Sequence, residues 1–206
     1  FRFPLQLAIV PEMLDMHMPA EGVFHNVVLV RIQKSYDGQA VKVMNALWGA
    51  GQMMFNKFLI VLDATVDLSD YSQVLHEVMT RVAPSRDLIF SRGPADVLDH
   101  SSQTFAYGGK LGIDATGTPT AIRSDSALNP GYLAQLSAQF PACHFVQPFG
   151  EYPLVFVFLK NPGTMALQAL QREILEACGN AAPRFIVYFD AEAKDLPLPA
   201  LVWLAA

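Results

Sequence analysis

A helix-like run followed directly by a strand-like run, residues 45–63, is the feature that most constrains the fold of this chain. It reads Asn-Ala-Leu-Trp-Gly-Ala-Gly-Gln-Met-Met-Phe-Asn-Lys and then Phe-Leu-Ile-Val-Leu-Asp. A continuous apolar strand is expected where both faces of a sheet are covered. One cation, Lys57, stands directly before that strand. The run predicts an α/β domain with Lys57 at an end of its sheet, where such sheets usually meet a ligand or a partner.

The segments around this run extend the pattern. Residues 27–32 form a β-branched run that predicts a buried strand, and residues 88–90 predict a short third strand. The helix between the first two strands has a one-sided apolar stripe formed by Ala40, Met44, Leu47, Trp48 and Gly51. A second helix, from Tyr71 to Val82, has Ser69 as its expected cap and ends before Pro84. The resulting βαβαβ order predicts a mainly parallel sheet with right-handed crossovers.

The second half of the chain resembles the first. Residues 154–159 and 185–189 predict strands, and Asn161-Pro162 predicts the start of the helix between them. Sliding the sequence by 127 positions places Asp190 on Asp63 and residue 154 on residue 27. Either the chain contains a duplication, or two unrelated βαβ units are similar by chance. We expect an α/β domain at 1–122 and a second, smaller α/β unit at 123–206, truncated in its last helix.

Between the halves, residues 91–152 are rich in Gly, Pro, Ser, Thr and Asp. This composition predicts a long excursion with little regular structure and a packed, functional role.

Composition excludes several classes of protein. The chain has 206 residues, of which 52% are hydrophobic and 16% charged, enough apolar material for one sizeable core or two small ones. A net charge of −5 without a basic cluster argues against nucleic acid as a partner. No apolar run reaches the roughly 18 residues of a membrane span, so the excess apolar surface is expected at subunit or domain contacts. Cys143 and Cys178 lie in apolar contexts and fit core thiols in a reducing, cytoplasmic compartment.

Both ends of the chain suggest a piece of a longer protein. It begins Phe-Arg-Phe-Pro, without an initiator methionine or a signal peptide. It ends in the apolar stretch Leu-Pro-Ala-Leu-Val-Trp-Leu-Ala-Ala, without a helix stop signal.

Two features could bind charged ligands. Lys57 is expected either to extend to solvent or to meet an anion such as a phosphate or a carboxylate. Asp63, Asp67 and Asp70 follow the central strand and could hold Mg²⁺, although helix capping and turn formation by Asp67 and Ser69 are favoured. The repeat retains only Asp195 in the corresponding segment and lends the metal no support.

Other motifs carry weaker signals. Residues 108–114, Gly-Gly-Lys-Leu-Gly-Ile-Asp, lack the spacing of a phosphate loop and predict a backbone turn. The five histidines show no spacing typical of a metal site. Asp99-His100-Ser101-Ser102 has the residue types of a catalytic triad, but adjacent positions do not make triad geometry.

Six segments taken together resemble the carboxy-terminal part of the UbiD family, the prenylated-flavin-dependent decarboxylases. They are Met-Pro-Ala-Glu-Gly-Val-Phe-His-Asn (18–26), the run 43–57, Asp-Leu-Ser-Asp-Tyr (67–71), Arg86-Asp87, Leu-Asp-His (98–100) and Gly-Lys-Leu-Gly-Ile-Asp-Ala-Thr (109–116). The resemblance covers residues 11–116 best, and the segment after Thr116 looks like the extension of longer members.

The resemblance implies a function for the intact protein. It implies non-oxidative decarboxylation of an aromatic or α,β-unsaturated acid, with a quinone precursor as one candidate and prenylated FMN as cofactor. The flavin, its divalent metal and the catalytic residues belong to an upstream domain, so no catalytic residue, metal or cofactor is expected in this fragment alone. This part closes over the flavin and makes contacts in a homo-oligomer, and Lys57 corresponds to a lysine that looks like a contact for the cofactor phosphate.

Two other classes of function stay open. One is a structural assembly module without cofactor contact, and the other is an independent nucleotide-binding α/β domain. A buried Lys57 facing a cavity favours the cofactor contact, whereas a solvated Lys57 favours the assembly module.

Overall fold

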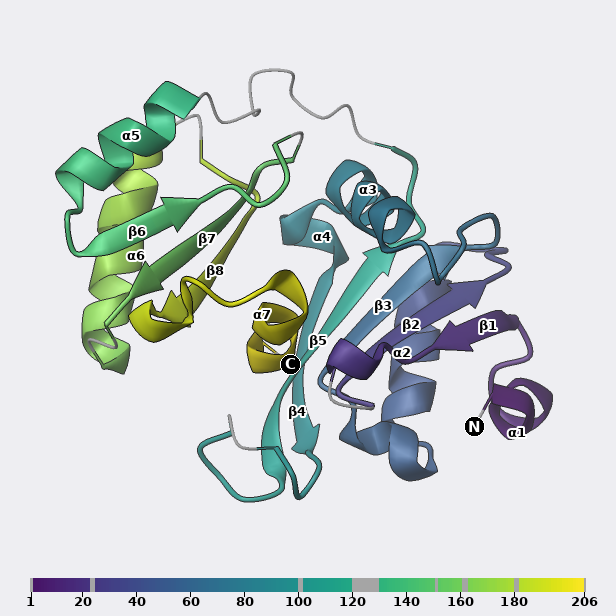
Figure 1. Ribbon diagram of the computed structural model, residues 1–206. Coiled ribbons are helices and arrows are strands. Elements are labelled where there is room, and N and C mark those ends of the chain that lie inside the picture. The colour runs from purple at the N-terminus through teal and green to yellow at the C-terminus, as the bar shows by residue number, and fades with distance from the viewer. Residues whose placement is uncertain are drawn as a thin grey trace. The chain divides into compact units, whose positions relative to one another are not determined.

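The computed structural model describes residues 2–22, 25–99, 102–119, 130–150, 152–160, 163–179 and 182–205. The chain divides into two compact units. The first comprises Phe1–Thr120 with residues 202–204 and 206, and the second comprises Ala121–Leu201 with residue 205. Each unit has a sheet of its own (Figure 1), and each is considered by itself.

The first unit contains a five-stranded sheet in the order β1-β2-β3-β5-β4. β2 pairs in parallel with β3, and β3 with β5, whereas the edge strands β1 and β4 pair antiparallel with their neighbours. The α/β class is confirmed, but the expectation of a mainly parallel sheet is wrong for both edges. The elements are α1 (Arg2–Ala8), β1 (Met13–His17), η1 (Ala20–Gly22), β2 (Val27–Ile32), α2 (Gln39–Trp48), η2 (Gly51–Phe55), β3 (Phe58–Asp63), α3 (Tyr71–Arg81), α4 (Pro84–Asp87), β4 (Leu88–Pro94) and β5 (Tyr107–Ala115).

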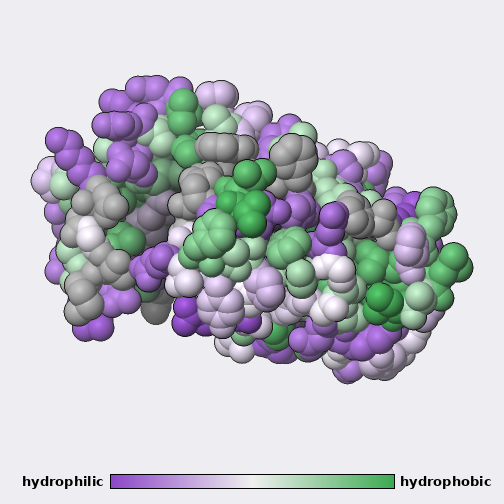
Figure 2. Space-filling model, turned by 90° about the horizontal axis from the view of Figure 1, so that it is seen from below, coloured by the Kyte–Doolittle hydropathy of each residue, from purple (hydrophilic) through white to green (hydrophobic). Residues whose placement is uncertain are grey.

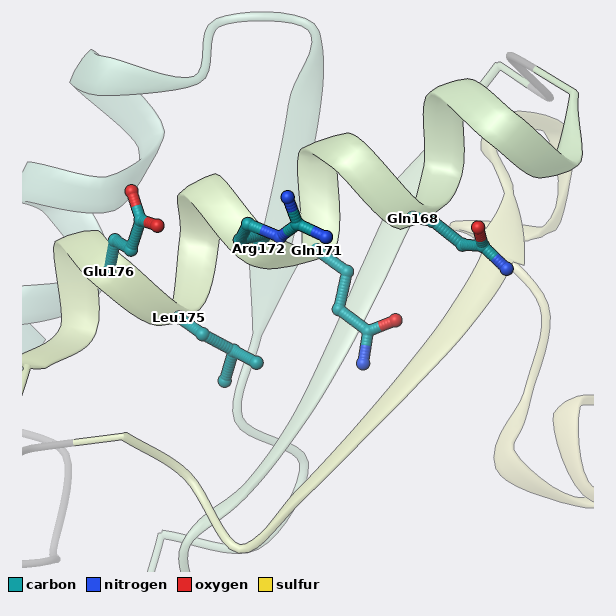
Figure 3. Close-up of a pocket in the computed structure, with 5 residues that line it drawn as sticks. All are labelled: Gln168, Gln171, Arg172, Leu175 and Glu176. Carbon is teal, nitrogen blue, oxygen red and sulfur yellow. The ribbon is translucent and has the colours of Figure 1, made fainter.

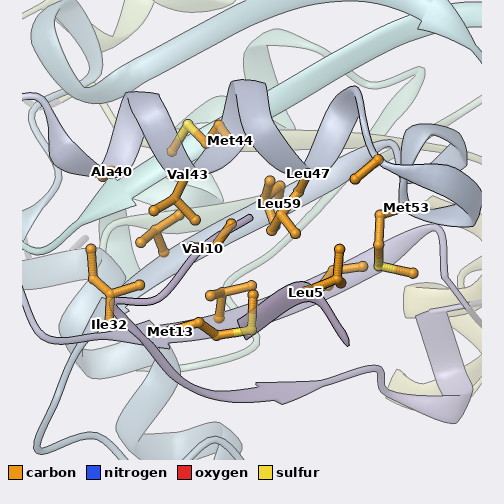
Figure 4. Close-up of a cluster of buried hydrophobic side chains, with 14 residues drawn as sticks. Leu5, Val10, Met13, Ile32, Ala40, Val43, Met44, Leu47, Met53 and Leu59 are labelled. Atoms are coloured by element: carbon orange, nitrogen blue, oxygen red, sulfur yellow. The ribbon is translucent and has the colours of Figure 1, made fainter. Parts of the chain in front are cut away.

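Helix α2 packs its predicted apolar stripe onto β2 and β3. Ala40, Met44 and Leu47 are completely buried, and they join strand residues in one apolar cluster (Figure 4). Burial of each large aliphatic side chain contributes about 1.5–3 kcal/mol relative to exposure. The cluster consists of Leu5, Val10, Met13, Val28, Val30, Ile32, Ala40, Val43, Met44, Leu47, Ala50, Met53, Leu59 and Val61.

The stretch from residue 91 to residue 152 is more regular than its composition predicts. It contains the end of β4, the whole of β5 and, in the second unit, a helix and a strand. The glycine-rich segment 108–114 is part of β5, so the predicted turn is wrong. Packing outweighs the low strand propensity of glycine here, because a Cβ at Gly112 would lie 3.1 Å from Trp48 Cη2 of α2. β5 inserts between β3 and β4, which explains why the third predicted strand is antiparallel.

The second unit contains a three-stranded sheet in the order β6-β7-β8. β6 pairs antiparallel with β7, and β7 pairs in parallel with β8. The predicted start of the middle helix at Asn161-Pro162 lies outside the described residues. The elements are α5 (Pro130–Gln139), β6 (Cys143–Val146), β7 (Leu154–Leu159), α6 (Thr164–Cys178), β8 (Phe185–Asp190), η5 (Ala191–Ala193) and α7 (Leu198–Ala205), of which residues 202–204 are grouped with the first unit.

The two units share their order of elements and their strand register. β2 and β3 pair from Val27↔Phe58 onward, and β7 and β8 pair from Leu154↔Phe185 onward, 127 positions later in both strands. Helix α7 likewise begins 127 positions after α3. In both units the first strand of the parallel pair also has an antiparallel neighbour, which is β1 for β2 and β6 for β7. This agreement supports a duplication over chance similarity.

No helix in the described part of the chain is both long enough and apolar enough to cross a membrane.

Candidate functional site

Lys57 lies at the amino end of β3, and its backbone is held from both sides. The N–H groups of Lys57 and Phe58 donate to the carbonyl of Asn26 at 3.0 and 2.8 Å, and the Lys57 carbonyl accepts from the N–H of Leu111 at 2.7 Å. Open α/β sheets usually bind ligands at the opposite, carboxyl end of their strands. Lys57 therefore does not occupy the edge where the sequence led us to expect a ligand.

The side chain of Lys57 is buried and paired. The residue is only 8% exposed, and its Nζ lies 3.1 Å from Oδ1 of Asp99. The Asp99 side chain is 2% exposed, and its second oxygen accepts a hydrogen bond from Ser102 Oγ. The expectation that Lys57 extends to solvent is wrong, because the chain between β4 and β5 brings a carboxylate to it.

A second buried lysine, Lys110 of β5, stabilises the turn that leads into β3. It is 5% exposed, and its Nζ donates to the carbonyls of Met54 and Asn56 at 2.6 and 2.7 Å. The Asn56 side chain in turn accepts from Trp48 Nε1 at 2.7 Å and donates to the carbonyl of Met53. Burial, together with the nearby charge of Lys57, lowers the pKa of Lys110 to about 8.

We expected no role for Lys110 from the sequence. It stands in the glycine-rich segment that we interpreted as a turn. The available signal is the pattern of β5, in which Gly108, Lys110 and Gly112 share the buried face of a strand with period two.

Four of the six segments quoted for the family resemblance meet at this end of the sheet. Asn26 comes from segment 18–26, Asn56 and Lys57 from 43–57, Asp99 from 98–100 and Lys110 from 109–116. The hydrogen bonds and the ion pair given above join all five residues. The resemblance thus rests on residues that build one structural feature.

An open pocket of about 460 Å³ lies beside the two lysines. Its described lining includes three cations, Lys57, Arg92 and Lys110, and no acidic residue. The Arg92 guanidinium lies over the ring of Tyr107, 5.6 Å from its centroid. Such a pocket favours an anionic ligand. The lining residues are Lys57, Phe58, Phe90, Ser91, Arg92, Ser102, Gln103, Thr104, Tyr107, Gly108, Gly109, Lys110 and Leu111.

Three glycines shape the site in different ways. A Cβ at Gly108 would collide with Ser102 Oγ, and a Cβ at Gly93 would come 3.0 Å from Cε of Lys110. A Cβ at Gly109 would meet no atom within 4 Å, although Gly109 lines the pocket. A larger side chain at position 109 would therefore fill the pocket without disturbing its walls.

The carboxylates after β3 have structural roles at the opposite end of the sheet. Asp67 accepts from the N–H and the hydroxyl of Ser69, which closes a turn. Asp70, not Ser69, caps α3, because its side chain accepts from the N–H groups of Ser72 and Gln73 at 3.0 and 3.1 Å. The prediction of Ser69 as the cap is wrong, since Asp67 already holds that hydroxyl.

Asp63 lies beside Arg81, with 3.2 Å between Oδ2 and Nη1. Burial raises the pKa of the Asp63 carboxyl, and the Arg81 charge opposes that rise. Across the described residues, no three His, Cys, Asp or Glu side chains are grouped to hold a metal ion.

The remaining sequence candidates do not form a site. His100 and Ser101 lie outside the described residues, and Asp99 is engaged with Lys57 and Ser102. Cys143 and Cys178 are buried free thiols, and burial raises the pKa of both, as expected for core cysteines.

The second unit has a concavity of about 430 Å³ on helix α6 (Figure 3). All five lining residues come from this one helix: Gln168, Gln171, Arg172, Leu175 and Glu176. Among the described residues no second element contributes a converging polar group, so this surface is not a candidate site.

Known sequences and structures extend these observations. Residues 2–115 match the family model of the 3-octaprenyl-4-hydroxybenzoate carboxy-lyase C-terminal domain, UbiD_C. An uncharacterised protein of Helicobacter pylori is 40% identical over 212 residues, covering 97% of this chain and 33% of that protein. An uncharacterised protein of Archaeoglobus fulgidus is 44% identical over 114 residues, covering 55% of this chain and 24% of that protein. The chain thus spans a quarter to a third of the length of these relatives.

Two solved structures share the fold. The vanillic acid decarboxylase of Sedimentibacter hydroxybenzoicus matches with a TM-score of 0.50 and 24% identity, over 84% of this chain and 31% of that chain. The UbiD-class enzyme HmfF of Pelotomaculum thermopropionicum, in complex with FMN, has the same TM-score and identity over 59% of this chain and 26% of that chain. The family model covers more than half of the chain, so this chain belongs to the UbiD family and contains the family's carboxy-terminal domain.

Proposed function

We propose that this chain is the carboxy-terminal part of a non-oxidative decarboxylase that uses prenylated FMN. Its substrate is an aromatic or α,β-unsaturated carboxylic acid, with a quinone precursor as one candidate. Support comes from the family match and from the shared fold with an aromatic-acid decarboxylase and an FMN-containing enzyme. The observation that carries the proposal is the pocket lined by Lys57, Arg92 and Lys110, which suits the phosphate of a flavin nucleotide.

Lys57 is the proposed contact for the cofactor phosphate. An ammonium group has three N–H donors, so Lys57 can bind a phosphate oxygen while one donor stays on Asp99. Asp99 then fixes the direction of the ammonium, and Lys110 fixes the turn from which Lys57 projects. When bound, the modified flavin supplies an electrophilic ring that stabilises the electrons left behind as CO₂ departs. The residues of this chain bind and orient, and the catalytic residues and the divalent metal are assigned to the upstream domain.

The two units have different proposed roles. Residues 1–122 form the family domain that closes over the flavin, and residues 123–206 form the second α/β unit of a longer member. The fragment is expected to be inactive alone and to act in the cytoplasm as part of a homo-oligomer. Exposed apolar side chains suited to subunit contacts lie on α1 (Phe3, Leu7) and between β4 and β5 (Val97, Leu98, Phe105). Figure 2 shows hydrophobic side chains gathered at the edge of the molecule that carries α1.

One observation favours a second candidate, a structural assembly module. The Lys57–Asp99 pair is buried and complete without any ligand, as in a structural ion pair. In that case Lys57 ties the segment before β5 to β3 and never contacts a cofactor.

The experiment uses the full-length parent protein loaded with prenylated FMN. Gly109→Leu fills the pocket, and we expect it to lower cofactor retention at least tenfold and to abolish CO₂ release from aromatic and acrylic acids. Gly150→Leu is the matched control, because a Cβ at Gly150 also meets no atom within 4 Å and this glycine lies in the second unit. Unchanged cofactor retention in a folded Gly109→Leu protein would favour the assembly module. A wild-type protein that retains the cofactor but releases no CO₂ from any acid tested would contradict the proposed decarboxylase activity.

A further inference from the structure

The duplication shows what the second unit lacks. In the first unit, β3 pairs on one side with β2 and on the other with β5, the second strand of the β4–β5 hairpin. Its counterpart β8 pairs with β7, and within the described residues the second sheet has no further strand. The edge of β3 that pairs with β5 therefore has a counterpart in β8 that pairs with no strand among the described residues. We call it the free edge of β8.

The backbone of β8 begins as that of β3 does. Arg184 stands 127 positions after Lys57, and the N–H groups of Arg184 and Phe185 both donate to the carbonyl of Pro153, at 2.8 and 3.3 Å. These bonds reproduce those that Lys57 and Phe58 make to Asn26. In β3, the Lys57 carbonyl faces the other way and accepts from Leu111 of β5. In a parallel ladder the residues alternate in direction, so the amides of Ile186 and Tyr188 face the free edge of β8.

The amino-acid composition of β8 would make an unpaired edge prone to aggregation. Residues 185–189 read Phe-Ile-Val-Tyr-Phe, without a proline, a charge or a glycine. Phe185, Ile186, Val187 and Tyr188 are all only half-buried, whereas Leu59 and Val61 of β3 are completely buried. Natural proteins protect long apolar edges with charges, prolines or bulges, or they cover them. Apart from Asp190 at its end, β8 has no charge, no proline and no break in its register, so we infer that its edge is covered.

We propose that a hairpin from the parent protein, following α7 in the sequence, pairs with β8. Its second strand lies parallel to β8, as β5 lies parallel to β3, and completes a five-stranded sheet in the second unit. The occupant is argued from the order of the repeat, in which the β4–β5 hairpin follows α3 and α7 is the counterpart of α3. The Helicobacter relative is about three times as long as the region it shares with this chain.

Amide hydrogen exchange in the full-length parent protein gives the first test. The amides of Ile186 and Tyr188 are expected to exchange within about tenfold of the rate of Val187, whose amide faces β7 and serves as an internal control. Exchange of Ile186 and Tyr188 more than about a hundredfold faster than Val187 would overturn the proposal. Protection that disappears on dilution would assign the edge to a second copy and would also overturn it.

Photo-crosslinking identifies the occupant. Phe185 is replaced by benzoylphenylalanine in the parent protein, and the crosslinked peptide is mapped by mass spectrometry. We expect an intrachain crosslink to a peptide that follows residue 206. The same substitution at Leu175, which is 39% exposed on α6, is the control and is expected to miss that peptide. A crosslink from position 185 to another copy, or to a segment preceding residue 206 other than the neighbouring strand β7, would contradict the proposal.

Discussion

Lys57 and Arg184 make the same backbone hydrogen bonds at the start of corresponding strands, but the residues around them differ. Both cations directly precede a strand, and both share a carbonyl acceptor with the next residue. Around Lys57 the β4–β5 hairpin supplies Lys110, Arg92 and Asp99, which build a cationic pocket. Around Arg184 the described residues contain no counterpart of that hairpin. The shared βαβ frame therefore positions a cation, and the inserted hairpin makes a site of it.

Breaking the ion pair of the first unit is expected to have the largest effect on stability. Asp99→Ala leaves the buried Lys57 ammonium without its carboxylate, which costs about 3–5 kcal/mol of unfolding free energy. Urea unfolding measures the loss. Asp190→Ala, at the exposed end of β8, removes only a cap on Glu192 N–H and should cost about 1 kcal/mol. Equal losses of unfolding free energy in Asp99→Ala and Asp190→Ala would contradict a stabilising ion pair that the first unit has and the second lacks.

Removing the second lysine comes next in size. Lys110→Met leaves the buried carbonyls of Met54 and Asn56 without their donor, and we expect a loss of about 2–4 kcal/mol. The measurement is again the unfolding free energy, with the exposed Lys194→Met of the second unit as the control, expected within about 0.5 kcal/mol of wild type. A loss below about 1 kcal/mol for Lys110→Met would show that this lysine does not hold the turn.

Helix capping outside the site should matter less. Asp70→Ala removes the acceptor for Ser72 and Gln73 and is expected to cost about 1 kcal/mol. Ser69→Ala should cost clearly less, because its hydroxyl only completes the turn with Asp67. Thermal unfolding measures the stability of both variants. A larger loss for Ser69→Ala than for Asp70→Ala would show that Ser69 is the cap.

The pH dependence of stability tests the lowered pKa of Lys110. The pKa of Lys110 is about 8 in the folded chain and about 10.5 in an unfolded one, so between these values unfolding takes up a proton. Stability from this group therefore rises as pH increases from about 8 to 10.5. The difference in unfolding free energy between wild type and Lys110→Met should grow over this range. A flat or falling difference would contradict the lowered pKa.

The apolar patterns predicted the frame well. Strands β2 and β7 have the predicted ends, and α2 buries Ala40, Met44 and Leu47 of the predicted stripe, because continuous apolar runs and helical spacing report directly on burial. The stripe was predicted one turn too long, since Gly51 is exposed and lies after the end of α2. The predicted offset of 127 positions relates the β7–β8 pair to the β2–β3 pair residue by residue.

The site was only partly predictable. Lys57 was found from its position before a buried strand, but its partner Asp99 is 42 positions away, on a segment whose path no local pattern fixes. β5 was missed because glycine has low strand propensity, and its fit against Met44 and Trp48 is visible only in three dimensions. Lys110 was missed with it.

The most direct measurement compares the two matched cations in the full-length parent protein. The dissociation constant of prenylated FMN is determined for wild type, Lys57→Ala and Arg184→Ala. A charge-assisted bond to phosphate contributes about 1.5–3 kcal/mol, so Lys57→Ala should weaken binding about 10–100-fold. Arg184→Ala should remain within about twofold of wild type. Equal affinity in wild type and a folded Lys57→Ala protein would contradict the assignment of the phosphate site to the first unit.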